Sequence, residues 1–398
     1  MGVILALGFV LRIILSRLGY NYDLESYWIV GEIVVRGGNV YAETHRYNYG
    51  PIWFYILGLV YWITDILGRG FGFFGLLIAV LLSFVDIGIF YILYKKFGLI
   101  TASIFFLNPV SIIITGYHRQ FDNLAILIAL YAIYLLDLGA YNFRKVLFIA
   151  FLIGLSITVK HVFFMLPVWL FFAHAIKDIK VKLMFLVIPL TVFLVSFVPF
   201  WQLGSEGIIQ NVFLYKSFSN SPFWYIFAPE PLYDLLASKK VFIGILIICG
   251  FLLRKLNVFQ LALIYTIFLV VFSPAIANQY LAIPLAAMAV YPNIFFFLYS
   301  YLTTVLLLKD KAALGVTPIG QYTELLPFDN LIIHTSIRAY DLIIVTGLGG
   351  LVMLLRQICK CRFHKLKSVV YYLLGTVKLW KKHANFLSLY LHTMKKKR

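Results

Sequence analysis

The chain has 398 residues, of which 62% are hydrophobic, 18% are aromatic and only 13% are charged, and its mean hydropathy is +0.93. No water-soluble domain of this length needs so much apolar surface, so the composition excludes a soluble globular protein and indicates a polytopic membrane protein. The net charge of +18 is not a nucleic-acid signature, because residues 356–398 alone hold twelve Lys and Arg and no acid beside a final apolar stretch.

Apolar stretches of helical length follow one another along the chain and predict an all-α fold. They lie at 2–18, 52–67, 71–94, 99–116, 123–138, 146–160, 162–176, 183–201, 240–253, 258–273, 279–292, 294–308 and 338–355. The first continues into the chain without a small-residue cleavage site. We therefore interpret it as a retained helix rather than a signal peptide.

Basic residues between these stretches predict which side of the membrane each connection occupies. Under the positive-inside rule, Arg144-Lys145, the lysines within 177–182 and Arg254-Lys255 belong in the cytoplasm. The connections expected on the opposite, outer face are 19–51, 117–123, 160–161, 202–238 and 273–279.

The pair Lys95-Lys96 conflicts with this assignment, because two apolar stretches separate it from the outer connection that ends at Pro51. Either these lysines break the rule or one of the two stretches does not cross the membrane. We favour an interfacial or re-entrant segment at 52–67, which is short and ends in the polar pair Thr64-Asp65.

Two carboxylates, Asp23 and Glu25, follow the first apolar stretch in a chain that is poor in acids. They are candidate catalytic residues, because burial at a membrane boundary sets the pKa of a carboxylate, as a general base requires. A spacing of two does not place both on one helix face, so we expect only one of them, with Asp23 preferred, to point at a reaction centre. The alternative is that both are ordinary solvated loop acids.

The connection 117–123 is unusually polar for a tight membrane turn. It carries His118, Arg119, Gln120, Asp122 and Asn123. The Arg119 guanidinium and the N-terminus of the following helix both suit a phosphate, so these five residues are candidates for donor phosphate or substrate binding. The alternative is a polar turn in which Asp122 caps a helix that begins at Asn123.

Lys160 and His161 stand between two apolar stretches and are candidate substrate-binding residues, since ionisable side chains at membrane depth are commonly functional. A cation here would offset the charge of a phosphate leaving group. The alternative is that Lys160 snorkels to the headgroups. Arg12, inside the first stretch, is a weaker candidate of the same kind.

Two later connections add further candidates for substrate binding. Tyr215 and Lys216 lie in the long aromatic and polar segment 202–238, which an interfacial amphipathic helix would also explain. Gln279, beside Asn278 and Tyr280, either binds a ligand or caps a helix.

The three cysteines provide no disulfide framework, and Cys359 and Cys361 lack the partner pair that a zinc site needs. The basic tail is expected in the cytoplasm. There, residues 366–391 suit a basic, aromatic-rich helix in the headgroup layer of anionic lipid.

Several segments resemble the GT-C glycosyltransferases, integral membrane enzymes that use polyprenyl-phosphate-linked sugar donors. The first connection resembles that of the first mannosyltransferase of GPI-anchor synthesis. The segment 118–123, after Asn108-Pro109, is similar to one in the dolichyl-phosphate-glucose-dependent glucosyltransferases and to one in the oligosaccharyltransferase catalytic subunit. The segment 159–167 resembles a Lys-His-aromatic-Pro segment of the same glucosyltransferases. The motifs that carry the resemblance are Asp23-x-Glu25, Tyr27, Gly37-Gly38-Asn39-Val40-Tyr41, Tyr47-Asn48-Tyr49-Gly50-Pro51, His118-x-Gln120-Phe121-Asp122-Asn123 and Lys160-His161.

The resemblance covers about residues 1–290 and implies an all-α, GT-C-like bundle of about 11–13 transmembrane helices with outer-face loops. It implies a catalytic module at 1–308. Residues 309–398 carry no part of the resemblance, and their apolar and basic pattern predicts an outer loop and final transmembrane helix at 309–355 and a basic cytoplasmic tail at 356–398. The large soluble domain of a full oligosaccharyltransferase is missing.

The activity that the resemblance implies is inverting transfer of mannose or glucose from a polyprenyl-phosphate donor to a lipid-linked or glycan acceptor, on the non-cytoplasmic face of a plasma or endoplasmic-reticulum-type membrane. Asp23 would take the proton of the acceptor hydroxyl, while Arg119, Lys160 and His161 would offset the charge of the leaving phosphate. No cofactor or metal is expected, although the acids on the outer face leave an incidental divalent cation open. Anionic lipids are expected at the basic tail and nucleic acid is not a partner.

Two other classes remain as alternatives. A secondary transporter would show an internal repeat and broken helices that meet near the bilayer midplane. A non-catalytic scaffold would tolerate neutralisation of the outer-face acids.

Overall fold

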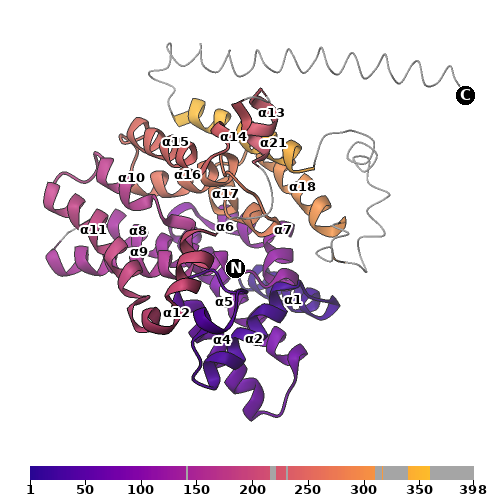
Figure 1. Ribbon diagram of the computed structural model, residues 1–398. Coiled ribbons are helices and arrows are strands. Elements are labelled where there is room, and N and C mark those ends of the chain that lie inside the picture. Colours follow the sequence, from indigo (N-terminus) through magenta and orange to yellow (C-terminus); the bar gives the residue numbers. More distant parts are fainter. Residues whose placement is uncertain (140–141, 216–220, 230–231, 310–315, 317–338, 359–398) are drawn as a thin grey trace, which may run out of the picture.

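The computed structural model describes residues 1–139, 142–215, 221–229, 232–309, 316 and 339–358. Every regular element in these residues is a helix, and the helices form one bundle with the N-terminal elements at one end and the last helices at the other (Figure 1). The predicted all-α fold is therefore confirmed for the described part of the chain.

The N-terminal part contains two helices within the segment 19–51, which the sequence analysis treats as an outer-face loop. The elements are α1 (Gly2–Leu18), α2 (Asp23–Val35), α3 (Val40–Glu43) and α4 (Pro51–Ile66). The chain turns by 89° between α1 and α2, and α2 then packs along α4. The expectation of a loop overlooked apolar positions spaced by three, Leu24, Tyr27, Val30 and Ile33, all of which are buried.

The middle of the bundle is built on α5, the longest single α-helix described. The elements are α5 (Phe71–Phe97), α6 (Leu99–Phe106), α7 (Pro109–Ile113), the π-helical turn η1 (Ile114–His118) and α8 (Asp122–Asp137). Pro109 has no N–H to continue α6, so the stretch predicted at 99–116 is bent by 50° there. α8 begins at Asp122 after Phe121, which corrects the expectation that Asp122 caps a helix starting at Asn123.

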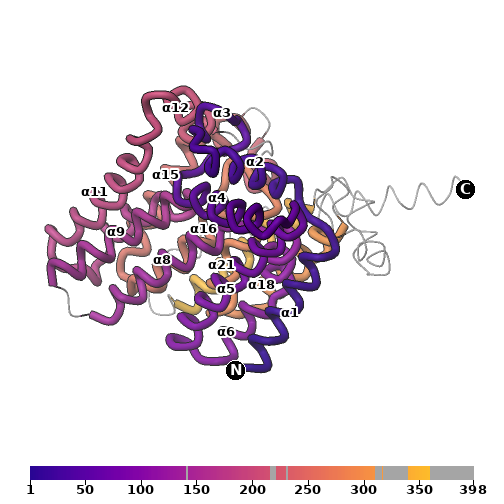
Figure 2. The backbone as a smooth tube through the Cα atoms, turned by 90° about the horizontal axis from the view of Figure 1, so that it is seen from below, coloured from indigo at the N-terminus to yellow at the C-terminus, as the bar shows by residue number. Residues whose placement is uncertain are grey.

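A third bend lies after α9, where the chain turns by 118°. The elements are α9 (Phe143–Val159), η2 (His161–Phe163), α10 (Leu166–Phe172), α11 (Ile179–Val195), η3 (Val198–Phe200), α12 (Trp201–Gly207) and η4 (Ile208–Phe213). α9 packs along α11 and α8, and Figure 2 shows α8, α9 and α11 as neighbours. The helical conformation that starts in α11 continues through η3, α12 and η4 to Phe213, although the apolar stretch was predicted to end at 201.

The remaining elements close the other end of the bundle. They are α13 (Pro222–Phe227), α14 (Tyr233–Leu236), α15 (Lys239–Leu252), α16 (Val258–Val271), η6 (Asn278–Ala282), α17 (Leu285–Val290), α18 (Ile294–Lys309) and α21 (Ala339–Ile358). α21 packs on α18 and α16, so the final helix lies against the part of the chain predicted as the catalytic module. The basic segment predicted at 366–391 lies outside the described residues.

The described helices fit a multi-pass membrane protein. Three of them are long and apolar enough to cross a membrane, and the number rises to six if each of three bent pairs is one span. Three shorter apolar helices, α4, α16 and α18, accompany them. The sequence contains more apolar stretches than the structure has long helices. Breaks divide several of these stretches into helices that are too short to span a bilayer alone.

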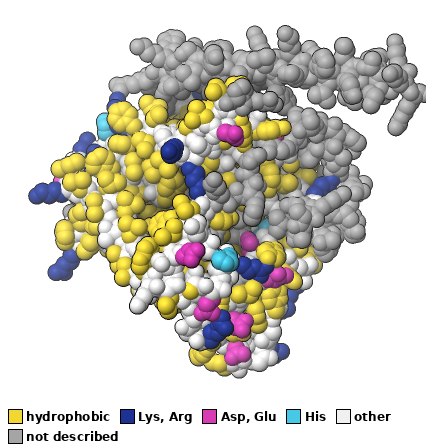
Figure 3. Space-filling model, in the orientation of Figure 1, with side chains coloured by type: hydrophobic (Ala, Val, Ile, Leu, Met, Phe, Trp, Pro, Cys, Tyr) yellow, Lys and Arg dark blue, Asp and Glu magenta, His cyan; other side chains and the backbone are white. Residues whose placement is uncertain are grey.

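Charged side chains are distributed unevenly over the bundle. On the face shown in Figure 3, acidic side chains gather mainly over the end that holds α2, α3 and α4, while apolar side chains cover much of the rest.

Two basic connections meet on another part of the bundle. The backbone N–H of His174 donates to the Arg254 carbonyl at 2.7 Å. This contact joins the basic connections after α10 and α15, which the positive-inside rule assigns to the same side.

Candidate functional site

A fully buried ion pair joins α1 to α5 in the centre of the N-terminal half. The Arg12 Nε donates to Asp86 Oδ2 at 2.9 Å, and neither side chain has any exposed surface. Arg12 Nη1 and Nη2 also donate to the carbonyls of Gly8 at 2.9 Å and Phe106 at 3.0 Å. The guanidinium therefore has the acceptors that a buried cation requires.

The Asp86 carboxylate is equally well satisfied. Oδ2 accepts from Thr115 Oγ1 at 2.7 Å and from Ser111 Oγ at 3.3 Å, and Oδ1 accepts from Asn123 Nδ2 at 2.6 Å. These partners come from α7, η1 and α8, so one carboxylate holds three elements against α1 and α5. Asp86 was not singled out from the sequence, although an acid in the middle of one apolar helix and Arg12 in the middle of another are natural partners.

The segment 118–123 sends its polar side chains in different directions. Gln120 donates from Nε2 to the Asp23 carboxylate and accepts from Tyr27 Oη at 3.3 Å. His118 Nδ1 lies 3.2 Å from Asn21 Nδ2. Asn123 belongs to the buried network around Asp86. One short segment thus connects the start of α2 with the core of the bundle.

Arg119 points back to the end of α1. Its Nη2 donates to the carbonyl oxygens of Ser16 and Gly19, and the side chain is buried. A cation at a helix C-terminus is stabilised by the unpaired carbonyls there. The backbone of Arg119 is left-handed, with φ of 55°, which turns its side chain away from that of Asp122.

Lys160 and Asp122 form a second buried ion pair, with Nζ 2.7 Å from Oδ2. Lys160 has an extended backbone where α9 ends, and Asp122 stands at the start of α8. The ammonium also lies 4.6 Å from the centre of the Phe121 ring and 5.1 Å from that of Tyr49. Asp122 and Lys160 are 38 residues apart in the sequence. They meet because one stands at the start of α8 and the other at the end of α9.

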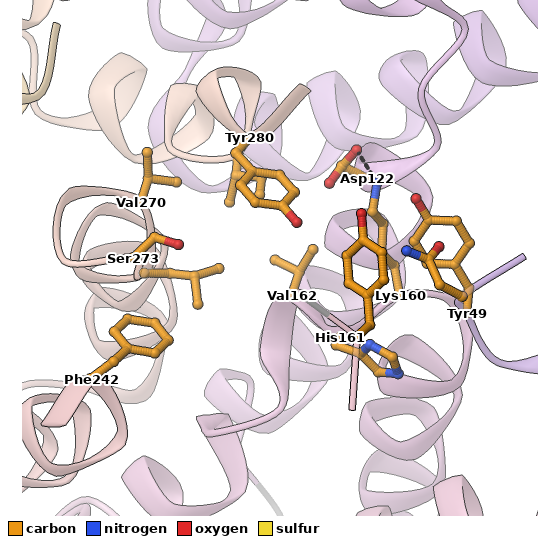
Figure 4. A pocket seen from close by; sticks show the side chains of 13 residues that line it. Tyr49, Asp122, Lys160, His161, Val162, Phe242, Val270, Ser273 and Tyr280 are labelled. Carbon is orange, nitrogen blue, oxygen red and sulfur yellow. Dashed lines mark hydrogen bonds and ion pairs between the residues drawn. The ribbon is translucent and has the colours of Figure 1, made fainter. Parts of the chain in front are cut away.

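These residues line a cavity of about 160 Å³. Figure 4 shows Asp122, Lys160, His161 and Tyr49 on one side of it and Phe242, Val270 and Ser273 on the other, with the Tyr280 hydroxyl pointing inward. Its lining residues are Asn48, Tyr49, Asp122, Lys160, His161, Val162, Tyr215, Phe242, Leu269, Val270, Ser273, Tyr280 and Ile283. The cavity therefore has a polar side with an ion pair and an apolar side made by α15 and α16.

Three tyrosines that line this cavity lie within electrostatic range of the Asp23 carboxylate. Burial raises the pKa of the Tyr49 and Tyr280 phenols most, a neighbouring tyrosine adds to the increase at both, and the Asp23 carboxylate adds less. Burial and then Asp23 also raise the pKa of Tyr215. All three phenols line the cavity and remain protonated at neutral pH, so each offers an O–H donor. Asp23 does not line the cavity, but its carboxylate accepts from Gln120, two residues before Asp122 on the polar side.

Two other predicted site residues, Glu25 and Gln279, lie apart from this group. Glu25 lies on a different side of α2, where its carboxylate is 43% exposed and 3.9 Å from the Arg46 guanidinium. Gln279 is half-buried in η6 and does not line the cavity. Lys216 lies outside the described residues. Ser273 and Phe242 also line the cavity, and neither could be recognised from the sequence, since neither carries a charge or belongs to a motif.

Gly50 fixes the position of Tyr49 against the end of α9. A Cβ at Gly50 would lie 2.1 Å from the Thr158 carbonyl oxygen, and Tyr47 Oη donates to the Gly50 carbonyl at 2.5 Å. We expect Gly50→Ala to destabilise the protein by about 1–3 kcal/mol, because backbone atoms must move apart. Thermal unfolding of the purified protein in detergent measures this loss.

Gly244→Ala is the matched control, because nothing lies within 4 Å of the added Cβ on α15. It should leave the unfolding temperature unchanged or raise it slightly. Equal unfolding temperatures for the two variants would show that the contact between Gly50 and α9 is not tight in solution.

Within the described residues, no group of three or more His, Cys, Asp or Glu side chains is placed to hold a metal ion. No family model, curated protein or solved structure matches this chain.

Proposed function

We propose that the chain is an inverting membrane hexosyltransferase. It moves mannose or glucose from a polyprenyl-phosphate donor to a lipid-linked or glycan acceptor on the non-cytoplasmic face. The observation that carries this proposal is the position of Asp23, held by Gln120 beside a cavity with a buried lysine on one wall and apolar side chains on the other.

The chemistry requires a base, a place for a phosphate and a dry environment. The acceptor hydroxyl oxygen attacks the anomeric carbon, its proton passes to Asp23, and the bond from the anomeric carbon to the phosphate oxygen breaks. Polyprenyl phosphate leaves with the bonding electrons. Lys160 lies at the cavity wall, where low polarity strengthens its attraction for the phosphate over the value in water.

The two sides of the cavity suit the two parts of such a donor. Leu269, Val270 and Ile283 give an apolar surface for the first isoprene units, and Tyr49 and Tyr280 give hydroxyl groups for the sugar. This proposal includes a GT-C-like bundle of about 11–13 spans, with some of the short helices crossing the membrane in pairs. Arg119, which contacts α1, has no part in donor binding here.

The direct test is transfer by the purified protein in detergent or lipid nanodiscs. The donors are radiolabelled polyprenyl-phosphate mannose and polyprenyl-phosphate glucose, offered with a panel of lipid-linked acceptors. We expect one donor to give a glycosylated acceptor with inverted anomeric configuration and free polyprenyl phosphate in equal amounts. Absence of transfer from both donors to every acceptor, by protein that unfolds cooperatively on heating, would contradict the proposal.

One feature of the fold favours a secondary transporter as a second candidate. Cavity residues stand at three helix interruptions: Asp122 follows η1, Lys160 precedes η2, and Tyr280 lies in η6. Transporters build their substrate sites at such breaks. Protein reconstituted in vesicles separates the two functions, since a transporter moves its labelled substrate across the bilayer unchanged and a transferase forms a new glycosidic bond.

A further inference from the structure

The carboxylate of Asp122 has one oxygen in use and one without a partner. Oδ2 pairs with Lys160 at 2.7 Å, while Oδ1 is buried and accepts a hydrogen bond from no other residue. The side chain is only 1% exposed. A buried carboxylate oxygen without a donor is costly and uncommon in folded proteins, so an unfilled acceptor that faces a cavity indicates a ligand.

The position of this oxygen is right for a molecule inside the cavity. Asp122 lines the cavity, and in Figure 4 its second oxygen points away from Lys160, toward the side where the Tyr280 hydroxyl projects. His161, on the same wall, also has a buried Nε2 without a partner. Asn48 and Tyr49 provide further polar groups around it. Several convergent polar groups in a half-apolar cavity are the usual features of a small-molecule site.

The local charges select the chemistry of the ligand group. Lys160 already neutralises the carboxylate, so a second cation would meet a positive charge less than 3 Å from Asp122. An anionic group at the free carboxylate oxygen itself would be repelled, so the donor phosphate can approach only the Lys160 side of the pair. What remains is a neutral donor, and a hydroxyl group of a sugar ring fits this description.

We propose that Asp122 is the sugar-binding residue of the cavity. Its free oxygen accepts a hydrogen bond from one hydroxyl of the donor hexose, and its paired oxygen holds Lys160 in place beside the phosphate. This inference rests on the proposed use of a polyprenyl-phosphate hexose. If Asp122 binds the sugar, the affinity for the donor depends on the hexose as well as on the lipid phosphate.

The variant Asp122→Asn tests the assignment. Its amide oxygen can still accept from Lys160, while its NH₂ replaces the free acceptor with a donor. Binding to the full chain is measured with two ligands, polyprenyl-phosphate hexose and sugar-free polyprenyl phosphate. We expect the variant to bind the hexose-bearing lipid at least tenfold more weakly, about 1.4 kcal/mol, and the sugar-free lipid at least as tightly as the wild type does, because the carboxylate charge beside Lys160 is gone.

Asp137→Asn is the matched control, because Asp137 ends the same helix and pairs with Lys96 at its surface. It should bind both lipids as the wild type does. Equal loss of both lipids in Asp122→Asn would overturn the sugar assignment in favour of a role in phosphate binding. Failure of the wild type to bind either lipid would refute the proposed function itself.

A series of monodeoxy hexose donors keeps the proposal testable if Asp122→Asn does not fold. With the wild-type protein, removal of one particular hydroxyl should weaken binding at least tenfold, since the site then buries an unpaired acceptor. If every monodeoxy donor binds as tightly as the parent hexose, Asp122 does not bind a sugar hydroxyl.

Discussion

Replacing Asp86 alone with leucine is expected to destabilise the protein by about 3–5 kcal/mol, because the Arg12 guanidinium then stays buried without its anion. The substitution also removes the acceptor for Ser111, Thr115 and Asn123. Thermal unfolding in detergent, with detergent-solubilised yield as a second readout, measures the loss.

Two further variants separate the charge from the packing. Arg12→Met combined with Asp86→Leu removes both charges and should recover much of the stability, since an apolar pair of similar volume is often as stable as a buried ion pair. Asp137→Leu should cost less than about 1 kcal/mol, because its partner Lys96 is near the surface. A double variant no more stable than Asp86→Leu would show that the hydroxyl and amide partners matter more than the unpaired arginine.

Much of the fold could be predicted from the sequence, because helix length and apolar composition are local properties. The stretches predicted at 240–253 and 258–273 correspond to α15 and α16 within two residues. Ser238 caps the N-terminus of α15, and Asn257 caps that of α16. α2 was harder to predict, because the acids in its first turn and the tyrosines just before it resemble a loop.

The candidate site could be predicted only in part. Asp122, Lys160, His161 and Tyr215 were each marked by polarity in an apolar chain, and all four line one cavity. Their pairing could not be predicted, because it depends on how helix breaks orient segments that are distant in sequence.

Arg119 shows that residues close in sequence need not belong to the same site. It stands three residues before Asp122, yet its left-handed backbone sends the guanidinium to the end of α1. The role of Asp86 likewise depends on contacts with α1, η1 and α8, which no local pattern specifies.

Neutralising Asp23 should abolish most of the transfer activity without unfolding the protein. Asp23→Asn keeps the shape of the side chain beside Gln120 and removes the proton acceptor, so kcat should fall about 10²–10⁴-fold. The KM for the donor should change little, since Asp23 does not line the cavity. Steady-state transfer with varied donor concentration measures both constants.

Glu25→Gln is the matched control for this prediction. Glu25 lies two residues along α2 but pairs with Arg46 at the surface, so its neutralisation should leave kcat nearly unchanged and cost less than about 1 kcal/mol of stability. The reverse result, an active Asp23→Asn and an inactive Glu25→Gln, would move the catalytic base to Glu25. If both variants remain active, neither acid in the first turn of α2 accepts the proton. The mechanism in which the acceptor is activated at the start of α2 would then be wrong.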